Sequence, residues 1–97
     1  MSDFKKIAEK TLDEIFNLIE SNYKNFEVDY EDENLRIDSL KNNNTYIISI
    51  HSPTSQIWLS SPLSGAHHFE MFSGRWISTR DKELRLLELL TKELDQS

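Results

Sequence analysis

Hydrophobic positions recur every three or four residues at both ends of the chain, which is the period of a helix packed on one side. Near the amino terminus this spacing predicts a helix over residues 4–23, with Ser2 or Asp3 as its cap. The apolar stripe of this helix consists of Phe4, Ile7, Ala8, Thr11, Leu12, Ile15, Ile19 and Tyr23. A second helix is predicted over residues 81–94, with Thr79 or Asp81 as its cap. Its stripe is formed by Leu84, Leu87, Leu90 and Leu94, and it is widened by Leu86 and Leu89.

Between the two helices the hydrophobic period changes to two, the spacing of half-buried strands. Six strands are predicted, at residues 26–31, 35–38, 45–51, 56–60, 67–71 and 75–78. The connections between them are short, and parallel neighbours would need long crossovers, so the strands should form an antiparallel meander. Each helix has one apolar stripe, so both helices should cover the same sheet face. We therefore predict a single domain over residues 1–97, an α+β two-layer sandwich with one sheet face open to water.

Trp58 departs from the pattern because it is a large apolar side chain on the polar side of its strand. In Gln56-Ile57-Trp58-Leu59-Ser60, the alternation points Ile57 and Leu59 inward and Trp58 outward. The pattern alone leaves two explanations open: a partner surface contacts Trp58, or a neighbouring strand or loop covers it. The count of layers favours exposure, since no element remains to cover the open face.

Composition narrows the possible chemistry. The chain has 97 residues, of which 37% are hydrophobic, enough for one small core. It has no cysteine, which excludes disulfides, thiolate metal sites and ligation of an iron–sulfur cluster by the chain itself. No apolar run approaches the length of a membrane span, and the first residues lead directly into a helical pattern. We therefore expect a cytoplasmic protein without a membrane partner.

The net charge of −6 is unevenly distributed. Residues 1–38 contain eleven acids and five bases, whereas residues 39–97 contain six of each. A nucleic-acid partner is disfavoured, because phosphate contacts need Lys and Arg, and the aromatic sheet surface lacks the basic surroundings that such binding requires. Cations or a basic protein surface are the partners that this charge favours.

Several short motifs, in this order and at these spacings, resemble the frataxin family, in particular its bacterial members. They are Gln56-Ile57-Trp58-Leu59-Ser60, then His68-Phe69-Glu70 and Arg75-Trp76-Ile77, together with the acids of the first helix and first strand. The resemblance extends from Phe4 to Leu94. It implies a frataxin-like fold, weak and reversible binding of Fe2+ and Fe3+ at an acidic ridge, and a non-catalytic role in iron–sulfur cluster assembly. It also implies docking on the cysteine desulfurase–scaffold complex, where such proteins regulate cluster formation or deliver iron.

The acids that would form this ridge are Asp13, Glu20, Glu27, Asp29 and Glu31. Carboxylates spread along a convex ridge attract hydrated iron loosely and steer a basic partner, although such acids also serve simply as a solvated face. Asn17 and Lys24 occupy positions where the family carries acids, so iron binding should be weaker than is typical. We rank partner docking above iron storage, and we expect Trp58, Gln56, Ser60 and His68 to supply its contacts beside Glu20, Glu27 and Asp29. The protein is expected to be a monomer.

The histidines and Trp76 give further expectations. His67 and His68 should point to opposite sheet faces. His68, Glu70 and a neighbouring His51 have side chains that suit Fe(II) or Zn(II), although surface histidines without a ligand are commoner. Trp76 should be buried under the last helix.

No nucleophilic motif or glycine-rich phosphate loop is present. The protein is therefore expected not to be an enzyme. The alternative is a ferroxidase that oxidises Fe(II) at the acidic ridge.

Overall fold

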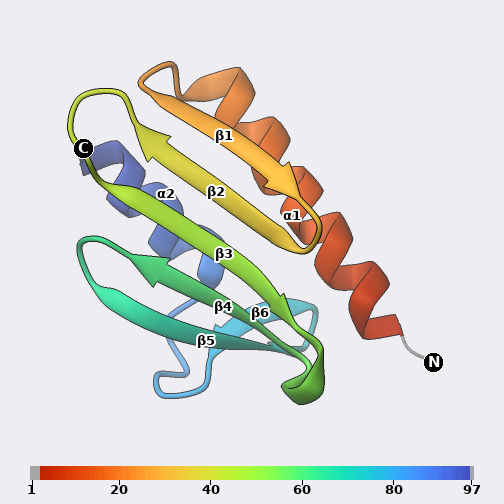
Figure 1. The fold of residues 1–97 in the computed structure, drawn as a ribbon. Helices are drawn as coiled ribbons and strands as arrows, with labels where there is room; N and C mark the ends of the chain where they lie inside the picture. The colour runs from red at the N-terminus through yellow and green to blue at the C-terminus, as the bar shows by residue number, and fades with distance from the viewer. Residues whose placement is uncertain (1–2, 97) are drawn as a thin grey trace.

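The chain folds into one helix, six consecutive strands and a closing helix. The computed structural model describes residues 3–96. The elements are α1 (Asp3–Asn22), β1 (Phe26–Glu31), β2 (Asn34–Ser39), β3 (Thr45–His51), the short 3-10 helix η1 (Ser52–Thr54), β4 (Gln56–Ser61), β5 (Gly65–Phe72), β6 (Arg75–Ser78) and α2 (Leu86–Gln96). The sheet order is β1-β2-β3-β4-β5-β6, and each strand is antiparallel to the next. Figure 1 shows both helices on one face of this open sheet, which confirms the predicted two-layer sandwich.

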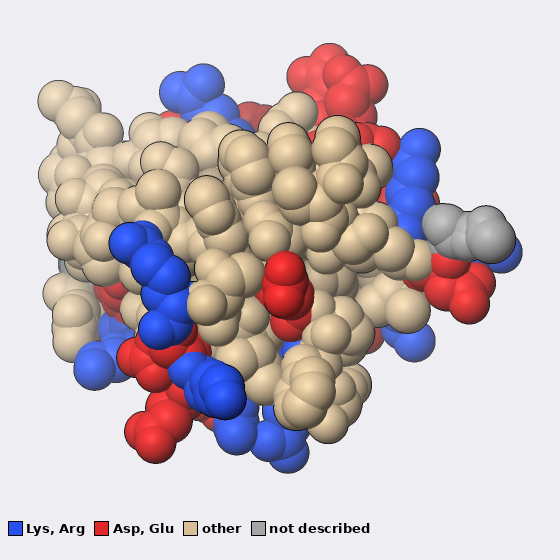
Figure 2. Space-filling view, turned by 90° about the horizontal axis from the view of Figure 1, so that it is seen from below, with Lys and Arg blue, Asp and Glu red and all other residues tan. Residues whose placement is uncertain are grey.

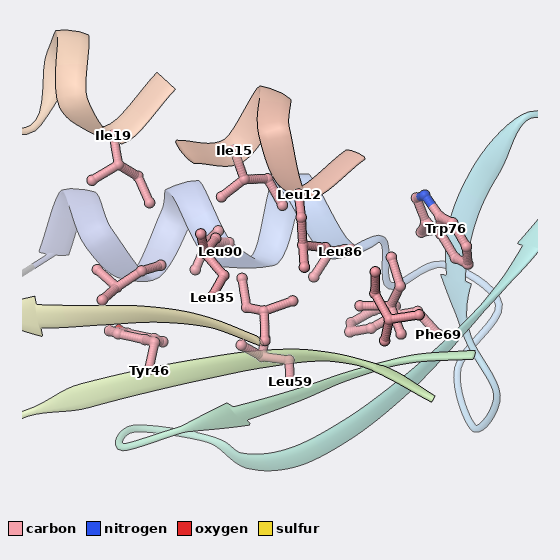
Figure 3. Packing of buried hydrophobic residues seen from close by; sticks show 14 of the residues in the cluster. Leu12, Ile15, Ile19, Leu35, Tyr46, Leu59, Phe69, Trp76, Leu86 and Leu90 are labelled. Atoms are coloured by element: carbon pink, nitrogen blue, oxygen red, sulfur yellow. The ribbon is translucent and has the colours of Figure 1, made fainter. Parts of the chain in front are cut away.

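The core lies between the helices and the covered sheet face, as the close view in Figure 3 shows. Every strand except β6 contributes aliphatic or aromatic side chains at alternate positions, and β6 contributes Trp76, which is 8% exposed. The apolar side chains that are at most 2% exposed are Ala8, Leu12, Ile15, Ile19, Leu35, Ile37, Tyr46, Ile48, Ile57, Leu59, Phe69, Leu86, Leu90 and Leu94. The burial predicted for Trp76 is confirmed, but its ring contacts Phe4 and Thr11 of α1 and was wrongly expected to lie under the last helix.

The first helix begins and ends one residue earlier than predicted. Ser2, one of the two predicted caps, lies outside the described residues. Ala8, Leu12, Ile15 and Ile19 form the buried stripe, as expected from their spacing. Ile7 was assigned to that stripe but is 41% exposed, because it lies on the flank of α1 where the sheet no longer covers the helix.

The second helix begins at Leu86 and not at residue 81. The preceding segment turns back on the sheet: the Ser78 N–H donates to the Leu84 carbonyl at 2.8 Å, and Arg85 forms an antiparallel bridge with Ile77. Asp81 accepts a hydrogen bond from the Glu83 N–H and therefore stabilises this turn instead of capping α2. The later start rotates the buried stripe to Leu86, Leu90 and Leu94, and Leu87 is 51% exposed, so the predicted stripe through Leu84 and Leu87 was wrong.

Two tight connections set the register of the open face. After η1, Ser55 adopts a left-handed conformation with φ of 54°, and its N–H donates to the Ser52 carbonyl. This turn places His51 directly opposite Gln56. Between β5 and β6, Ser73 and Gly74 have φ of 53° and 78°, the two positive values of a type I′ hairpin turn.

Candidate docking site on the open sheet face

Trp58 lies near the middle of the open face, with β3 on one side and β5 on the other. In the register of the sheet it is opposite Ser49 on β3 and His68 on β5. Ile57 and Leu59, its neighbours in β4, are fully buried on the helix side. The outward direction predicted for Trp58 from the two-residue period is therefore the direction observed.

Both faces of the Trp58 ring are covered by histidine side chains. The ring of His51 stacks on one face with a centroid distance of 3.8 Å and an interplanar angle of 17°. The ring of His68 stacks on the other face at 4.4 Å and 21°. Trp58 is consequently half-buried, whereas His68 is exposed. We name these three residues the His–Trp–His stack.

Two hydrogen bonds fix the orientation of the indole within this stack. The Trp58 Nε1–H donates to Gln56 Oε1 at 2.7 Å, and Gln56 Nε2 donates to Glu70 Oε2 at 3.0 Å. His51 is held in a similar way, because its Nδ1 lies 2.7 Å from the Thr54 hydroxyl. The indole N–H of Trp58 is therefore bonded to Gln56. A ring face of Trp58 becomes accessible to a partner when His51 or His68 is displaced.

The stack corrects two expectations. The expectation that nothing covers Trp58 is wrong, because the cover comes from side chains of adjacent strands and not from a further layer. The idea that His51 and His68 join Glu70 around one metal ion also fails, because the indole separates the two imidazoles. His67 points to the opposite sheet face, as predicted, since it is paired with the inward Leu59.

Uncharged side chains cover much of one side of the molecule. Figure 2 shows the molecule from below, on the side of β5 and η1, and most of this surface carries neither acids nor bases. Most of the Lys, Arg, Asp and Glu side chains in this view lie towards its margins, and one acidic side chain lies near its middle. Ser60, a predicted contact residue, is exposed two positions after Trp58 on the same outward side of β4.

Three of the predicted ridge acids lie together at the junction of α1 and β1. Glu20, Glu27 and Asp29 line a shallow depression that Lys24 also borders. Asp13 lies elsewhere on α1. Glu31 lies at the far end of β1, opposite Asn34. Within residues 3–96, no three His, Asp or Glu side chains converge as a metal-binding group, so these acids form a field and not a coordination sphere.

A second group of acids surrounds Tyr30 on β1. Burial raises the pKa of the Tyr30 phenol, and the nearby carboxylates of Asp13, Glu9 and Glu33 raise this pKa further, because each disfavours a phenolate. Glu33 also forms an ion pair with Lys5 at 3.1 Å. The sequence analysis did not include Glu9 and Glu33 among the acids of the ridge. Their position in the acidic first third of the chain could have indicated that they belong to this group.

Arg36 interrupts the acidic side of the sheet. It lies opposite Asp29 in the register, and its Nε forms a 3.0 Å ion pair with Asp38. The hydrogen bond from the Thr45 hydroxyl lowers the pKa of Asp38, and the Arg36 guanidinium lowers this pKa as well. The acidic field is therefore concentrated at β1 and α1, and it weakens towards β3.

The comparisons with known proteins agree with this geometry. Residues 1–97 match the frataxin-like domain family. The mitochondrial frataxin homolog of Schizosaccharomyces pombe is 34% identical over 101 residues, which cover 97% of this chain and 63% of that protein. The chain belongs to the frataxin family.

The other proteins that this frataxin domain resembles differ in length. The mitochondrial frataxin homolog of Saccharomyces cerevisiae is 42% identical over 53 residues, covering 55% of this chain and 30% of that protein. The chain thus spans less than two thirds of the length of both relatives. A frataxin structure from Psychromonas ingrahamii, of the CyaY family, superposes with a TM-score of 0.86 at 26% identity, covering 98% of this chain and 89% of that one. The structure of trimeric Saccharomyces cerevisiae frataxin complexed with ferrous iron superposes with a TM-score of 0.76 at 28% sequence identity. The superposition covers 99% of this chain and 85% of that one.

One buried charged residue of this frataxin fold was not identified from the sequence. Glu93 on α2 is 6% exposed, and its carboxylate accepts hydrogen bonds from Ser61 at 2.5 Å and Ser64 at 2.6 Å. The Ser64 hydroxyl also lies 2.8 Å from His67 Nε2. These contacts join α2 to the β4–β5 connection and hold the far end of the Trp58 strand in place.

Proposed function

We propose that this protein is an iron-binding accessory factor of iron–sulfur cluster assembly. In this proposal it docks on the cysteine desulfurase–scaffold complex and regulates cluster formation or delivers iron, without catalysing a reaction itself. The frataxin family is generally iron-binding and linked to iron–sulfur cluster biogenesis. The observation that carries the docking claim is the outward Trp58, held in a defined orientation on the open sheet face by its hydrogen bond to Gln56.

The mechanism is electrostatic steering followed by short-range contact. Glu20, Glu27 and Asp29 would attract a basic patch of the desulfurase, or loosely held iron, from a distance. Trp58 would then provide the contact, since an aromatic side chain on an open sheet face is typical of binding surfaces. Gln56 and Ser60 flank it with groups able to form hydrogen bonds.

Iron binding is tested by titrating the isotopically labelled protein with Fe(II) under anaerobic conditions and following each residue by NMR. We expect perturbations at Glu20, Glu27 and Asp29, and we expect them to weaken in the E20Q/E27Q variant. The matched control is E83Q/E88Q, which removes the same charge from exposed positions near α2. Equal binding by the two double variants would refute a localised ridge site. When oxygen is admitted, Fe(II) should disappear at the rate seen in buffer, and a faster, ridge-dependent rate would favour the ferroxidase alternative.

Docking is tested by measuring the affinity of the protein for the desulfurase with its scaffold protein. Trp58→Ala should weaken this affinity by at least tenfold, as truncation of an interface aromatic typically does. Phe72→Ala is the matched control, because Phe72 is an aromatic residue that is 68% exposed at the end of β5 and outside the stack. If neither variant changes the affinity, or if wild-type protein does not bind, the docking assignment fails.

A further inference from the structure

The His–Trp–His stack has a property that docking alone does not require. Trp58 is enclosed by two histidine rings, and histidine is in general the side chain that can gain a proton between about pH 5 and pH 8. A cation placed over the face of an indole is attracted by the ring quadrupole. Protonation of either imidazole should therefore tighten its contact with Trp58.

We propose that the His–Trp–His stack is a pH-dependent cover of the docking surface. At acid pH the imidazolium rings of His51 and His68 close over Trp58, and at neutral to alkaline pH the neutral rings are displaced more easily by a partner. This proposal rests on the proposed function for the identity of the partner. The closing of the stack itself is a property of the isolated protein.

The hydrogen bonds around His51 are compatible with both charge states. The Thr54 hydroxyl oxygen lies 2.7 Å from His51 Nδ1 and 3.4 Å from the His51 carbonyl oxygen, to which the hydroxyl can donate. When this hydroxyl donates to the carbonyl, Nδ1–H can donate to the hydroxyl oxygen, and this contact has the same direction for a neutral imidazole and for an imidazolium. No contact in this arrangement has to break when the ring becomes charged.

The charged groups near the stack come from each neighbouring element. Glu70 lies on the outward side of β5, two residues from His68, and accepts a hydrogen bond from Gln56. Arg80 brings a positive charge to the same strand, since its guanidinium donates to the Ala66 carbonyl. Near His51, the Glu33 carbonyl accepts the Ile50 N–H, and the Glu33 carboxylate is paired with Lys5.

Protonation of the imidazoles should weaken docking through two effects. An imidazolium is harder to displace from the indole than a neutral imidazole, so a ring face of Trp58 becomes less available. Added positive charge also opposes a basic partner of the kind proposed above. From the usual strength of cation–π contacts at exposed sites, we expect acidification to weaken docking by about fivefold if one ring is displaced and about thirtyfold if both are.

The first experiment measures the accessibility of Trp58 in the isolated protein. The Trp76→Phe background leaves Trp58 as the only tryptophan, and acrylamide quenching reports how easily a small neutral molecule reaches its ring. We expect the bimolecular quenching constant to fall by about twofold or more between pH 8 and pH 5.5. This fall should disappear in H51Q/H68Q, because glutamine does not titrate. His67→Gln is the matched control and should behave like the parent, since His67 lies on the other sheet face.

The Trp58 indole N–H resonance of the wild-type protein gives the same information without the Trp76 substitution. It should shift with pH in the wild type and in His67→Gln, but not in H51Q/H68Q. A quenching constant that is unchanged by pH, or a pH response that survives in H51Q/H68Q, would overturn the proposal.

The second experiment compares the affinity for the desulfurase with its scaffold protein at pH 8 and pH 6. Wild type and His67→Gln should bind more weakly at pH 6, whereas H51Q/H68Q should lose most of this difference. Strong docking with the same pH dependence in all three proteins would refute the cover and leave the proposed function intact. Absence of docking at both pH values would refute the proposed function and the docking role of the stack, while the quenching result still decides whether the stack closes.

Discussion

Trp76 offers a quantitative test of how the sheet edge is anchored to the first helix. Its side chain is 8% exposed and lies edge-on to Phe4, with a ring centroid distance of 6.0 Å and an interplanar angle of 76°. Its Nε1–H donates to the Thr11 hydroxyl at 2.8 Å. Of the two β6 residues that precede Ile77, Arg75 is exposed and Trp76 is buried. Trp76→Ala should therefore release β6 from α1.

The expected cost follows from the buried area. A buried tryptophan removes about 150–250 Å² from water, which at about 25 cal/mol per Å² corresponds to about 4–6 kcal/mol as an upper bound. Part of this area remains buried by alanine, so Trp76→Ala should lower the free energy of unfolding by about 3–5 kcal/mol, the range typical of such truncations. A domain of this size has a total stability of about 5–15 kcal/mol, so the variant should be marginally folded. Trp76→Phe keeps the ring and loses the hydrogen bond, and its cost should be about 1–2 kcal/mol.

Urea denaturation followed by far-UV circular dichroism measures these differences, and Trp58→Ala is the comparison. Trp58 loses two ring stacks, each worth about 0.5–1.5 kcal/mol, so its truncation should cost about 1–3 kcal/mol. A cost below about 1.5 kcal/mol for Trp76→Ala, with an unchanged m-value, would contradict the reasoning. So would equal destabilisation by the two tryptophan variants.

Three further substitutions probe separate features. Glu93→Gln should lower the free energy of unfolding by about 1–3 kcal/mol, since it replaces an acceptor of two serine hydroxyls by a neutral amide; urea midpoints measure this. Asp38→Asn should destabilise the protein at pH 7. The pKa of Asp38 is lowered in the folded state, so its carboxylate stabilises the fold above its ordinary pKa, and this contribution is lost as the pH falls through the lowered value. Urea midpoints of wild type and Asp38→Asn should therefore converge on acidification, and a constant gap would contradict this linkage. Ser73→Asn should raise the melting temperature, with a gain of about 0.5 kcal/mol, because asparagine suits the positive φ at this turn position; no change or a decrease would argue against the turn assignment.

Much of the fold follows from hydrophobic spacing alone. The two-residue period placed Tyr46, Ile48 and Ile50 on the buried side of β3, and all three are buried there. The three-to-four period placed α1 within one residue of its observed bounds. These predictions succeed because burial of one face is the dominant requirement of each element. The position of Trp58 on the open face follows from the same requirement.

The start of α2 could not be obtained in this way. Residues 81–85 have helical spacing and a plausible cap, but the chain uses them to return to the sheet edge, where Arg85 pairs with Ile77. A backbone bridge between distant residues leaves no mark in a periodicity pattern. Tertiary pairing therefore overrides local preference at this point. Leu90 and Leu94 keep their predicted buried positions, and Leu86 joins them in place of Leu84 and Leu87.

The His–Trp–His stack was missed for a different reason. The sequence identified His68 as a neighbour of Trp58, and the short turn before β5 fixes that pairing. His51 is opposite Gln56 and reaches Trp58 only along a diagonal, so alternation assigns it to the correct face without predicting the contact. Diagonal neighbours on a sheet are within reach of aromatic side chains. A map of the register, and not only of inward and outward positions, would have been needed to expect both rings.

The sheet separates the acidic field from the aromatic contact, and this separation determines how each should affect docking. Glu27 and Asp29 are on β1, whereas Trp58 is on β4, three strands away. At about 4.8 Å between strands this is about 14 Å, longer than the Debye length of about 10 Å at 0.1 M salt. Arg36 on the intervening β2 shortens the reach of the acids further. The acids therefore act on a partner that is still approaching, and Trp58 acts on one that has arrived. Charge removal at β1 should lower the association rate and its salt dependence, whereas truncation of Trp58 should raise the dissociation rate.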